Sequence, residues 1–549
     1  MKNFSVLIGG KAGSGIDTAA LIIAKLFNQL GYNIYIYRDY PSVIRGGHTF
    51  AIIRASIDKI SAHEDKVDFI LALNQDTMDR HQNFIKDTTK IIYDADSLKT
   101  EGIAVFLQKV LKEMQAPRVM RNSIMIGAFA KIVGIDLEIV KDVFKKRFTK
   151  DKDTNLKVAT RGYEDAKEVI KIEKASDNKK PIITGNDAVS LGFLNAGIDS
   201  YISYPMTPSS AILHFLAKIA HKFNLKVLHP ESEISAIIMA LGFAAAGKKV
   251  ATGTSGGGYC LMTEGISFAA MAELPVVVVL GQRPGPATGL PTYSGQSELN
   301  FALYSAHGEF SRFVVAPADP EEAYYWSSVA LNMAWKYQIP SIILTDKALA
   351  EGVYSFDKPT QKEIKEFKPT LWDKKDSYKR YKFTENGVSP LAFYSDKNAV
   401  IKINSYEHDE FGVTTEDAKL SEKMQEKRVG KEKYLKKDLE DFDCVNVYGN
   451  KDSKDAILCW GSNKGVCIEA AEKLNLKVIH PIVMHPFPEK QFKEAMKNVK
   501  TLISVELNVT GQLANLIKSY GFKVDKQINK YDGRPFTVEE LIQRIKKVK

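Results

Sequence analysis

The beginning of the chain alternates short apolar runs with segments whose apolar residues recur every three or four positions. Apolar runs of a few residues bounded by turn residues predict strands, and the longer spacing predicts helices. The first run is followed by a glycine turn and a helical pattern that ends at Leu30. The strand-like runs lie at residues 4–8, 34–37, 50–55, 69–73 and 90–93. This alternation predicts a doubly wound α/β domain over residues 1–175, with a parallel or mixed sheet.

The rest of the chain predicts two further α/β regions. In the region 181–356, residues 276–280 and 341–345 are apolar throughout, which is typical of strands buried on both faces. Residues 357–445 are rich in Lys and Glu, with aromatic residues between them, and indicate a linker or peripheral arm. Alternation of strands and helices returns over residues 446–549. We therefore predict an α/β protein of three domains, with an arm before the last.

Composition and charge exclude several classes of protein. A chain of 549 residues with 44% hydrophobic content can form three sizeable cores. The net charge of +10 comes from scattered basic residues, which does not favour nucleic acid as a partner; it suits an acidic protein partner or reflects a lysine-rich proteome. The N-terminus does not resemble a secretory signal, and no run reaches membrane-spanning length, so we expect a cytoplasmic protein with no membrane contact.

The four cysteines, Cys260, Cys444, Cys459 and Cys467, form no CxxC pair and do not lie beside histidines at zinc-ligand spacing. A [4Fe–4S] cluster normally takes closely spaced thiolates. We therefore expect neither a disulfide framework nor a metal or cluster site in this chain. Any iron–sulfur chemistry would come from another chain.

The glycine turn near the N-terminus is a candidate anion site. Gly10, Gly13 and Gly15 lie between a predicted strand and a predicted helix, where free backbone amides can hold a phosphate. The order is GxxGxG, and Ile16 stands where a Walker loop has lysine. Asp39 stands where a ribose-binding acid would, which leaves an NAD-dependent dehydrogenase as an alternative. The other interpretation is that the glycines only permit a tight turn.

Three polar segments follow strand-like runs or open helices in the second region: residues 204–210, 231–236 and 282–292. Ligands of open α/β sheets bind beyond the carboxyl ends of the strands, where such segments meet. Each segment also has a simpler explanation. Thr207 can contribute to a helix cap, Glu233 suits a helix N-terminus, and Arg283 can pair with a neighbouring acid instead of a ligand carboxylate.

These segments, in this order, resemble the alpha subunit of the 2-oxoacid:ferredoxin oxidoreductases, in the form that has a gamma-type domain fused in front. The resemblance covers nearly the whole chain and includes residues 40–48 and 531–536. It implies a gamma-type domain, a thiamine-diphosphate-binding domain of the pyrimidine type and a transketolase C-terminal-like domain. This sequence has Met206 where isoleucine is common, and Gly257 and Cys260 where proline and serine are frequent, which leaves the substrate preference open.

The resemblance also implies roles for individual residues. Glu233 resembles the catalytic glutamate that hydrogen-bonds the aminopyrimidine of thiamine diphosphate. The expected contacts to the carboxylate and keto oxygen of the substrate are Thr207, Arg283 and Thr292. The residues expected to line the cofactor are Tyr204, Pro205, Ser255 and Gly256. Gly10, Gly13 and Gly15 become candidates for the phosphates of coenzyme A (CoA).

One half of the cofactor site is missing from the sequence. Thiamine diphosphate binds through Mg²⁺, normally held by a Gly-Asp-Gly motif with an asparagine downstream, and no such arrangement is present. We therefore expect a beta subunit to carry the Mg²⁺ and pyrophosphate site and a [4Fe–4S] cluster. The implied reaction is the CoA-dependent oxidative decarboxylation of a 2-oxoacid, with 2-oxoglutarate favoured, to acyl-CoA and CO₂, with electrons passing to ferredoxin. A non-catalytic scaffold or regulatory paralogue and an NAD-dependent dehydrogenase are the alternatives.

Overall fold

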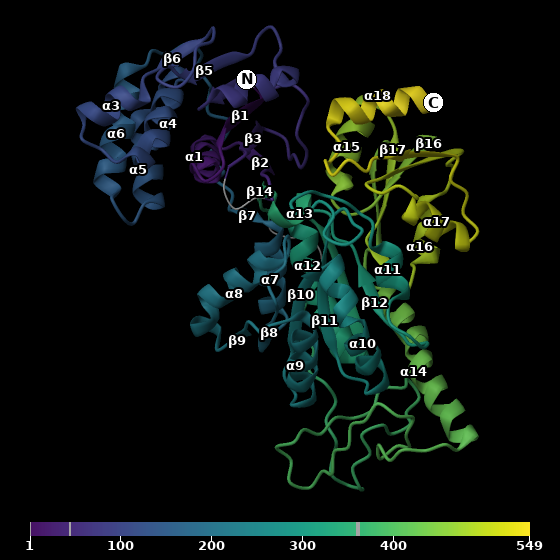
Figure 1. Cartoon of the computed structure of the whole chain (residues 1–549). Helices are drawn as coiled ribbons and strands as arrows, with labels where there is room; N and C mark the ends of the chain where they lie inside the picture. The colour runs from purple at the N-terminus through teal and green to yellow at the C-terminus, as the bar shows by residue number, and fades with distance from the viewer. Residues whose placement is uncertain (1, 43–45, 358–362) are drawn as a thin grey trace. The chain divides into compact units, whose positions relative to one another are not determined.

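The computed structural model describes residues 2–42, 46–357 and 363–549, which form two compact units (Figure 1). The first unit comprises Met1–Ile183, Gly352–Asp357 and Phe536–Lys547, and the second comprises Thr184–Glu351, Lys358–Pro535 and the last two residues. Their strands form three sheets, of eight, seven and five strands. The predicted α/β fold class is confirmed, whereas the expected boundaries of three domains stay a prediction. Residues 43–45 of the motif at 40–48 lie outside the described residues.

The sheet of the first unit has the order β6-β5-β4-β1-β3-β2-β14-β7. Its strands are β1 (Asn3–Lys11), β2 (Asn33–Asp39), β3 (His48–Ser56), β4 (Phe69–Ala72), β5 (Lys90–Asp94), β6 (Ile103–Val105), β7 (Ile182–Thr184) and β14 (Val353–Ser355). Strand β1 is parallel to β4, and β3 is antiparallel to both β1 and β2. The sheet is mixed because the connection from β2 to β3 is too short for a parallel crossover.

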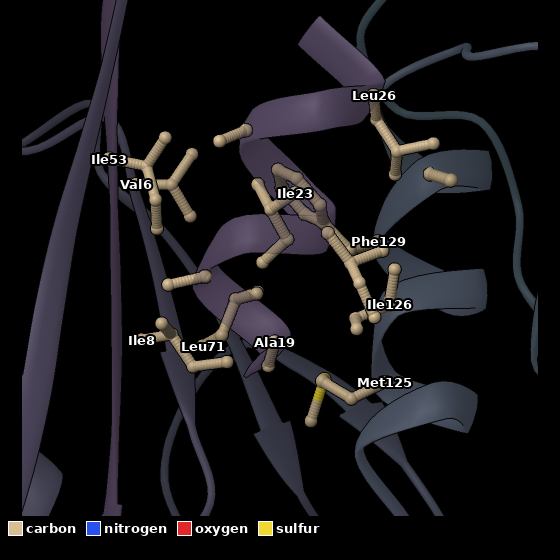
Figure 2. Packing of buried hydrophobic residues seen from close by; sticks show 14 of the residues in the cluster. Val6, Ile8, Ala19, Ile23, Leu26, Ile53, Leu71, Met125, Ile126 and Phe129 are labelled. Atoms are coloured by element: carbon tan, nitrogen blue, oxygen red, sulfur yellow. The ribbon is translucent and has the colours of Figure 1, made fainter. Parts of the chain in front are cut away.

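The helices of the first unit are α1 (Ile16–Gln29), α2 (Gln75–Arg80), α3 (Leu107–Glu113), α4 (Arg121–Ile132), α5 (Leu137–Arg147), α6 (Lys152–Asp165) and most of α18 (Val538–Val548). Figure 2 shows Ile23 of α1 among Val6 of β1, Leu71 of β4 and Phe129 of α4, all of them buried. Helix α1 therefore contributes apolar side chains both to the sheet and to α4. This burial is the main source of stability of the layer.

The larger sheet of the second unit has the order β18-β12-β13-β11-β10-β8-β9. Its strands are β8 (Ser200–Ile202), β9 (Lys226–Leu228), β10 (Val250–Ser255), β11 (Val276–Gln282), β12 (Phe313–Val315), β13 (Pro340–Asp346) and β18 (Val483–His485). All neighbours are parallel except β12 and β18. Every residue of β11 and β13 is buried, as the continuous apolar runs predict.

Helices cover this sheet, and a second sheet follows in the same unit. The helices are α7 (Gly185–Asn195), α8 (Ser210–Phe223), α9 (Glu233–Ala245), α10 (Gly256–Met271), α11 (Leu299–Tyr304), α12 (Pro320–Tyr337) and α13 (Lys347–Glu351). The second sheet has the order β15-β17-β16-β19-β20, with strands β15 (Val445–Gly449), β16 (Asp455–Cys459), β17 (Lys477–Pro481), β19 (Thr501–Glu506) and β20 (Lys526–Asn529). It is accompanied by α15 (Asn463–Leu474), α16 (Glu489–Ala495) and α17 (Gln512–Ser519). Among the described residues, no helix is long and apolar enough to cross a membrane.

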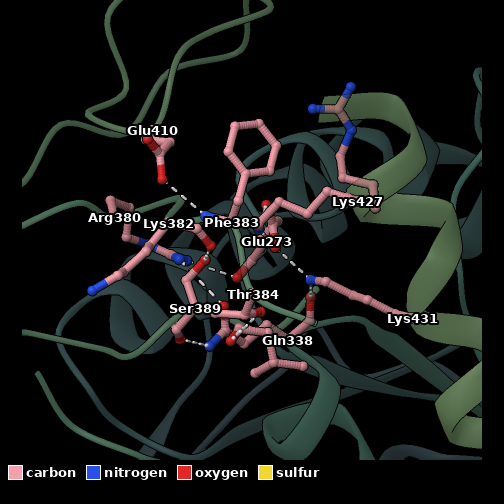
Figure 3. A network of polar contacts seen from close by, with 12 residues as sticks. Glu273, Gln338, Arg380, Lys382, Phe383, Thr384, Ser389, Glu410, Lys427 and Lys431 are labelled. Atoms are coloured by element: carbon pink, nitrogen blue, oxygen red, sulfur yellow. Dashed lines mark hydrogen bonds and ion pairs between the residues drawn. The ribbon is translucent and has the colours of Figure 1, made fainter. Parts of the chain in front are cut away.

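The lysine-rich segment before β15 is held by buried charges. It ends in the long helix α14 (Ala418–Leu439), whose Lys427 and Lys431 both bind the carboxylate of Glu273 (Figure 3). Arg380 donates to the backbone oxygens of Ala272 and Glu273, at 3.0 and 2.7 Å. Burial alone would raise the pKa of Glu273, but these cations hold it well below its usual range. The segment is therefore anchored to the end of α10 by an ionised carboxylate, and removing one partner would leave a buried charge unpaired.

Candidate active site

The polar segments found in the sequence lie at the carboxyl edge of the larger sheet of the second unit. Residues 204–210 follow β8, Glu233 opens α9 after β9, Ser255 ends β10 and Arg283 follows β11. Strands β9, β8, β10 and β11 are neighbours in that order and run parallel. Their carboxyl ends therefore meet at one edge, where ligands of open α/β sheets bind.

Glu233 is buried at the start of α9. Ser232 caps this helix by accepting a hydrogen bond from the backbone of Ser235, and the side chain of Glu233 is turned inward, with the residue only 4% exposed. A methyl group on Gly258 would lie 2.5 Å from Oε1 of Glu233 and 2.1 Å from Oγ1 of Thr254, so only glycine fits there. Oε1 has no hydrogen-bond partner among the described residues. A buried acceptor of this kind is available to a ligand.

The loop after β8 is bound to the ends of β10 and β11. Oγ1 of Thr254 lies 3.9 Å from Sδ of Met206, and Nη1 of Arg283 donates to the backbone oxygen of Thr207 at 3.1 Å. Helix α8 begins after Ser209, whose side chain makes no capping hydrogen bond. These contacts connect the loop to Thr254, which with Glu233 lies against Gly258, on one side and to Arg283 on the other.

Arg283 is nearly buried, at 9% exposed, and its Nε has no hydrogen-bond partner within the described part of the chain. Burial lowers the pKa of Arg283, and the nearby carboxyl of Glu298 opposes this shift. A guanidinium is always charged in proteins and matches a carboxylate with two parallel hydrogen bonds. Arg283 is therefore available for a carboxylate ligand.

Thr292 lies in the same loop as Arg283. The backbone N–H of Leu290 donates to the oxygen of Pro284 at 2.9 Å, so the loop returns to the residue that follows Arg283. A Cβ at Gly289 would lie 1.8 Å from that oxygen, which makes glycine necessary for the return. Thr292 is buried, at 7% exposed. The structure thus brings the loops of Thr207, Arg283 and Thr292 together.

The four residues expected to line the cofactor lie at the same edge. The ring of Tyr204 packs edge-on against His229, with centroids 5.9 Å apart, and Pro205 beside it is partly buried. Ser255 is buried, and its Oγ has no hydrogen-bond partner in the ranges that the structure describes. Gly256 starts α10. Their contacts to a cofactor stay a prediction.

The sequence interpretation missed Glu298, which lies at the start of α11 and is 8% exposed. Its Oε1 accepts a hydrogen bond from Oγ of Ser297 at 3.0 Å and lies 3.0 Å from where a Cβ on Gly256 would be. Oε2 has no partner among the residues described. Burial raises the pKa of Glu298 to about 7, against the effects of Ser297 and Arg283. The available signal was its position, since it is the only acidic residue between Arg283 and α11.

The glycine turn belongs to the first unit, whereas the candidate active-site residues described above belong to the second. Gly13 and Gly15 have φ angles of 80° and 81°, which glycine adopts freely. A Cβ on Gly10 would lie 3.0 Å from the side chain of Ile16, so packing against α1 accounts for this glycine. The amides of Ala12 and Ser14 already donate to backbone oxygens. The turn conformation explains Gly13 and Gly15, and phosphate or CoA binding there stays a prediction.

Comparison with known proteins gives matches along almost the whole chain. Three family models match: pyruvate ferredoxin/flavodoxin oxidoreductase at residues 5–165, the thiamine-diphosphate-binding model of pyruvate flavodoxin/ferredoxin oxidoreductase at 192–427, and core domain II of pyruvate:ferredoxin oxidoreductase at 455–541. The 2-oxoacid:ferredoxin oxidoreductase subunit alpha of Saccharolobus solfataricus is 31% identical over 99% of this chain and 97% of its own length. The chain belongs to the 2-oxoacid:ferredoxin oxidoreductases, as an alpha subunit. The resemblance found in the sequence is thereby confirmed.

Two further similarities are to proteins named for 2-oxoglutarate. The chain is similar to the solved 2-oxoglutarate:ferredoxin oxidoreductase from Magnetococcus marinus, with a TM-score of 0.91, 29% identity and coverage of 100% of this chain and 99% of that one. That protein was solved with 2-oxoglutarate, coenzyme A and succinyl-CoA bound. The 2-oxoglutarate synthase subunit KorA of Archaeoglobus fulgidus is 33% identical over 42% of this chain and 67% of its own length.

The residues of the alpha subunit fit one half of a thiamine diphosphate site. The matched thiamine-diphosphate-binding region contains Glu233, Ser255 and Arg283. The buried oxygens of Glu233 and Ser255 that lack protein partners among the described residues suit the polar edge of an aminopyrimidine. The sequence has no Gly-Asp-Gly motif with a downstream asparagine for Mg²⁺ and the pyrophosphate. In the part of the chain that the structure describes, no group of three or more His, Cys, Asp or Glu side chains is arranged to hold a metal ion.

Proposed function

We propose that this alpha subunit activates thiamine diphosphate and binds the substrate in a CoA-dependent oxidative decarboxylation of a 2-oxoacid, with 2-oxoglutarate as the preferred substrate. The observation that carries the proposal is that two buried groups, Oε1 of Glu233 and Nε of Arg283, have no partner among the described residues and are connected through the loop after β8. Glu233 and Thr254 both lie against Gly258, Thr254 lies 3.9 Å from Met206, and Arg283 donates to the backbone oxygen of Thr207. One group accepts a proton or hydrogen bond, and the other is a fixed positive charge. A cofactor ring and a carboxylate substrate need such a pair of groups at one site.

Each residue then has a defined task. When bound, thiamine diphosphate supplies a carbon nucleophile for the 2-oxo carbon and an electron sink for decarboxylation. The buried Oε1 of Glu233 accepts the hydrogen bond of the aminopyrimidine ring. Arg283 holds the substrate carboxylate, and Thr207 and Thr292 orient the keto oxygen. Fixing the substrate in this way turns the first step into a reaction between oriented groups.

The experiment that tests the function is an assay of the alpha subunit assembled with its beta subunit. We expect ferredoxin reduction that requires both CoA and a 2-oxoacid, with the highest kcat/KM for 2-oxoglutarate among 2-oxoglutarate, pyruvate and 2-oxoisovalerate. Omitting thiamine diphosphate should abolish the reaction. Reduction of NAD in place of ferredoxin, or activity without CoA, would contradict the proposal.

The missing half of the site calls for a partner, and the alpha subunit exposes apolar side chains next to Glu233. On α9, Ile234, Ile238 and Met239 are 51%, 48% and 37% exposed, and Leu261 on α10 is 49% exposed. These two helices pack on one another and begin at the cofactor edge of the sheet. Exposed apolar groups gathered at a functional site indicate a protein interface. We assign this surface to the beta subunit, which would bring the Mg²⁺ and pyrophosphate site and the [4Fe–4S] cluster.

Ile238→Arg is expected to prevent assembly with the beta subunit. A charge in the centre of an apolar interface is left without water or a partner, which costs several kcal/mol. Co-purification and size-exclusion chromatography of the two subunits measure the effect. Val119→Arg, which also adds arginine at a highly exposed position but lies in the first unit, is the control. Normal assembly of the Ile238 variant would move the interface elsewhere.

The preference for 2-oxoglutarate rests on a second cation near the substrate loop. The guanidinium of Arg534 lies over the ring of Tyr293, 4.3 Å from its centroid, and Tyr293 follows Thr292. The backbone N–H of Ser294 donates to the oxygen of Gly533 at 2.9 Å, which fixes the two segments together. 2-Oxoglutarate differs from pyruvate by a second carboxylate, and Arg534 offers it an exposed positive charge. The two similar proteins named for 2-oxoglutarate support the same preference.

Arg534→Ala is expected to raise the KM for 2-oxoglutarate by about fivefold, the value of one exposed ion pair. The KM for pyruvate should stay the same, because pyruvate has no second carboxylate. Pyruvate is therefore the control within the same preparation of enzyme. An equal rise for both substrates would mean that Arg534 supports the loop rather than selecting the substrate.

A further inference from the structure

Glu298 is a second carboxyl at the candidate active site. It belongs neither to the residues expected to line the cofactor nor to those expected to bind the substrate. It is 8% exposed, and Oε2 has no hydrogen-bond partner in the described part of the chain. Its backbone N–H donates to Oε1 of Gln282 at 3.2 Å. Gln282 ends β11 and directly precedes Arg283, so Glu298 lies beside the end of that strand. Its Oε1 lies against Gly256 at the start of α10. The carboxyl therefore lies between the start of α10 and the loop of Arg283.

Helix α11 also packs on β13 and α17. On β13, the buried carboxyl of Asp346, the register partner of Gln282, accepts hydrogen bonds from Ser294, Ser462 and the backbone of Leu349. On α17, the charged residue is Lys518, which is exposed.

Gly256 on α10 and Gln282 on β11 are neutral, and Ser297 donates a hydrogen bond. Arg283 is the charged side chain that acts on Glu298, yet Oε2 of Glu298 and Nε of Arg283 both lack a partner among the residues described. Each of these two side chains thus has one atom available to bind a ligand. Glu233 lies against Gly258, two residues further along α10, and is the other carboxyl of the site.

We propose that Glu298 sets the charge of the substrate pocket: its protonated carboxyl leaves Arg283 free for the 2-oxoacid carboxylate, and its ionised carboxylate competes with the substrate for Arg283. The inference rests on the proposed role of Arg283. Glu298 acts through Arg283 and is therefore a positioning residue. In a buried site, an ionised Glu298 and the carboxylate of the substrate repel one another, so ionisation of Glu298 disfavours substrate binding.

The sign of the pH dependence follows from the protonation of Glu298. Burial raises its pKa to about 7, so the proton is present below this pH and is lost above it. The protonated form binds substrate, so affinity is full at low pH and falls as the pH rises. If protonation is obligatory for binding, the KM for the 2-oxoacid rises by roughly tenfold per pH unit above the pKa.

The test compares the KM for 2-oxoglutarate between about pH 6 and 8.5, a range that spans the pKa, in the wild-type complex and in the Glu298→Gln complex. Glutamine keeps the size and hydrogen bonds of the protonated acid but does not ionise. We expect the wild-type KM to rise above about pH 7 and the KM of the variant to stay low and flat. The effects of pH on the other groups are common to both proteins. Glu309→Gln, at an exposed position, is the control and should keep the wild-type profile.

A second measurement needs no variant. Calorimetric titration of the wild-type complex with oxamate, a non-reacting 2-oxoacid analogue, in buffers of different ionisation enthalpy counts the protons bound. We expect uptake of about one proton at about pH 8 and almost none at about pH 6. Parallel KM profiles for wild type and Glu298→Gln, or no proton uptake at the higher pH, would overturn the inference. If Arg283→Ala changes no KM at any pH, it is the proposed substrate site that fails.

Discussion

Glu233→Gln in the assembled complex is expected to lower kcat by about 100- to 10,000-fold, the usual contribution of a positioned acid or base. The substitution keeps the volume of the side chain, and Gly258 leaves room for either group. It removes the carboxylate that, in the proposed function, would accept the hydrogen bond of the aminopyrimidine. The KM for the 2-oxoacid should change little, because the substrate contacts belong to other loops. Steady-state ferredoxin reduction at saturating CoA measures both constants.

The control for this variant is Glu231→Gln. Glu231 lies two residues earlier, just before the same helix, but it is exposed and its carboxylate accepts from the hydroxyl of Ser235. Turnover should therefore stay near the wild-type value. Size-exclusion chromatography of both variants with the beta subunit separates loss of chemistry from loss of assembly. Near-normal turnover of an assembled Glu233→Gln complex would remove Glu233 from its assigned role.

The α/β fold could be predicted from the sequence because its signals are local. Continuous apolar runs became the buried strands β11 and β13. Of the predicted glycine turn, Gly13 and Gly15 lie in the connection from β1 to α1, whereas Gly10 lies within β1 and pairs with Thr49. The polar segments could be expected at one edge because parallel strands place their carboxyl ends together. The same topology brings Arg283 to the backbone of Thr207. The distance between the two cannot be obtained from the spacing of apolar and polar residues alone.

Other features could not be predicted, since they depend on contacts between residues far apart in sequence. Lysine-rich composition indicates a solvated segment, yet Lys427 and Lys431 are buried around Glu273, 154 and 158 residues away. Burial lowers the pKa of Lys427 to about 7 despite the carboxylate beside it. The burial of Glu298 could not be predicted for the same reason, because only the fold shows that it lies against Gly256. Charged residues are exposed on average, but whether an individual one is buried depends on its partners.

Arg283→Ala is expected to lower kcat/KM for the 2-oxoacid by about 100-fold, mostly through KM. Charge-assisted hydrogen bonds in a buried site are worth about 1.5–3 kcal/mol, and a tenfold change corresponds to about 1.4 kcal/mol. The loss is large because Arg283 is almost fully buried and its Nε is free of protein partners in the described residues. The same steady-state assay, with the substrate varied at fixed CoA, measures it.

Arg283→Lys and added guanidinium separate binding from structural support. Lysine keeps the charge but loses the planar fork that binds a carboxylate with two hydrogen bonds, so we expect partial activity with a KM between those of wild type and alanine. Guanidinium in solution can occupy the space left by Arg283→Ala and should restore part of the activity, which a misfolded loop would not allow. Arg118→Ala, at an exposed position in the first unit, should leave both constants unchanged. If the subunit served only as a scaffold, the wild type and the Arg283→Ala, Arg283→Lys and Arg118→Ala variants would all show the same apparent substrate affinity.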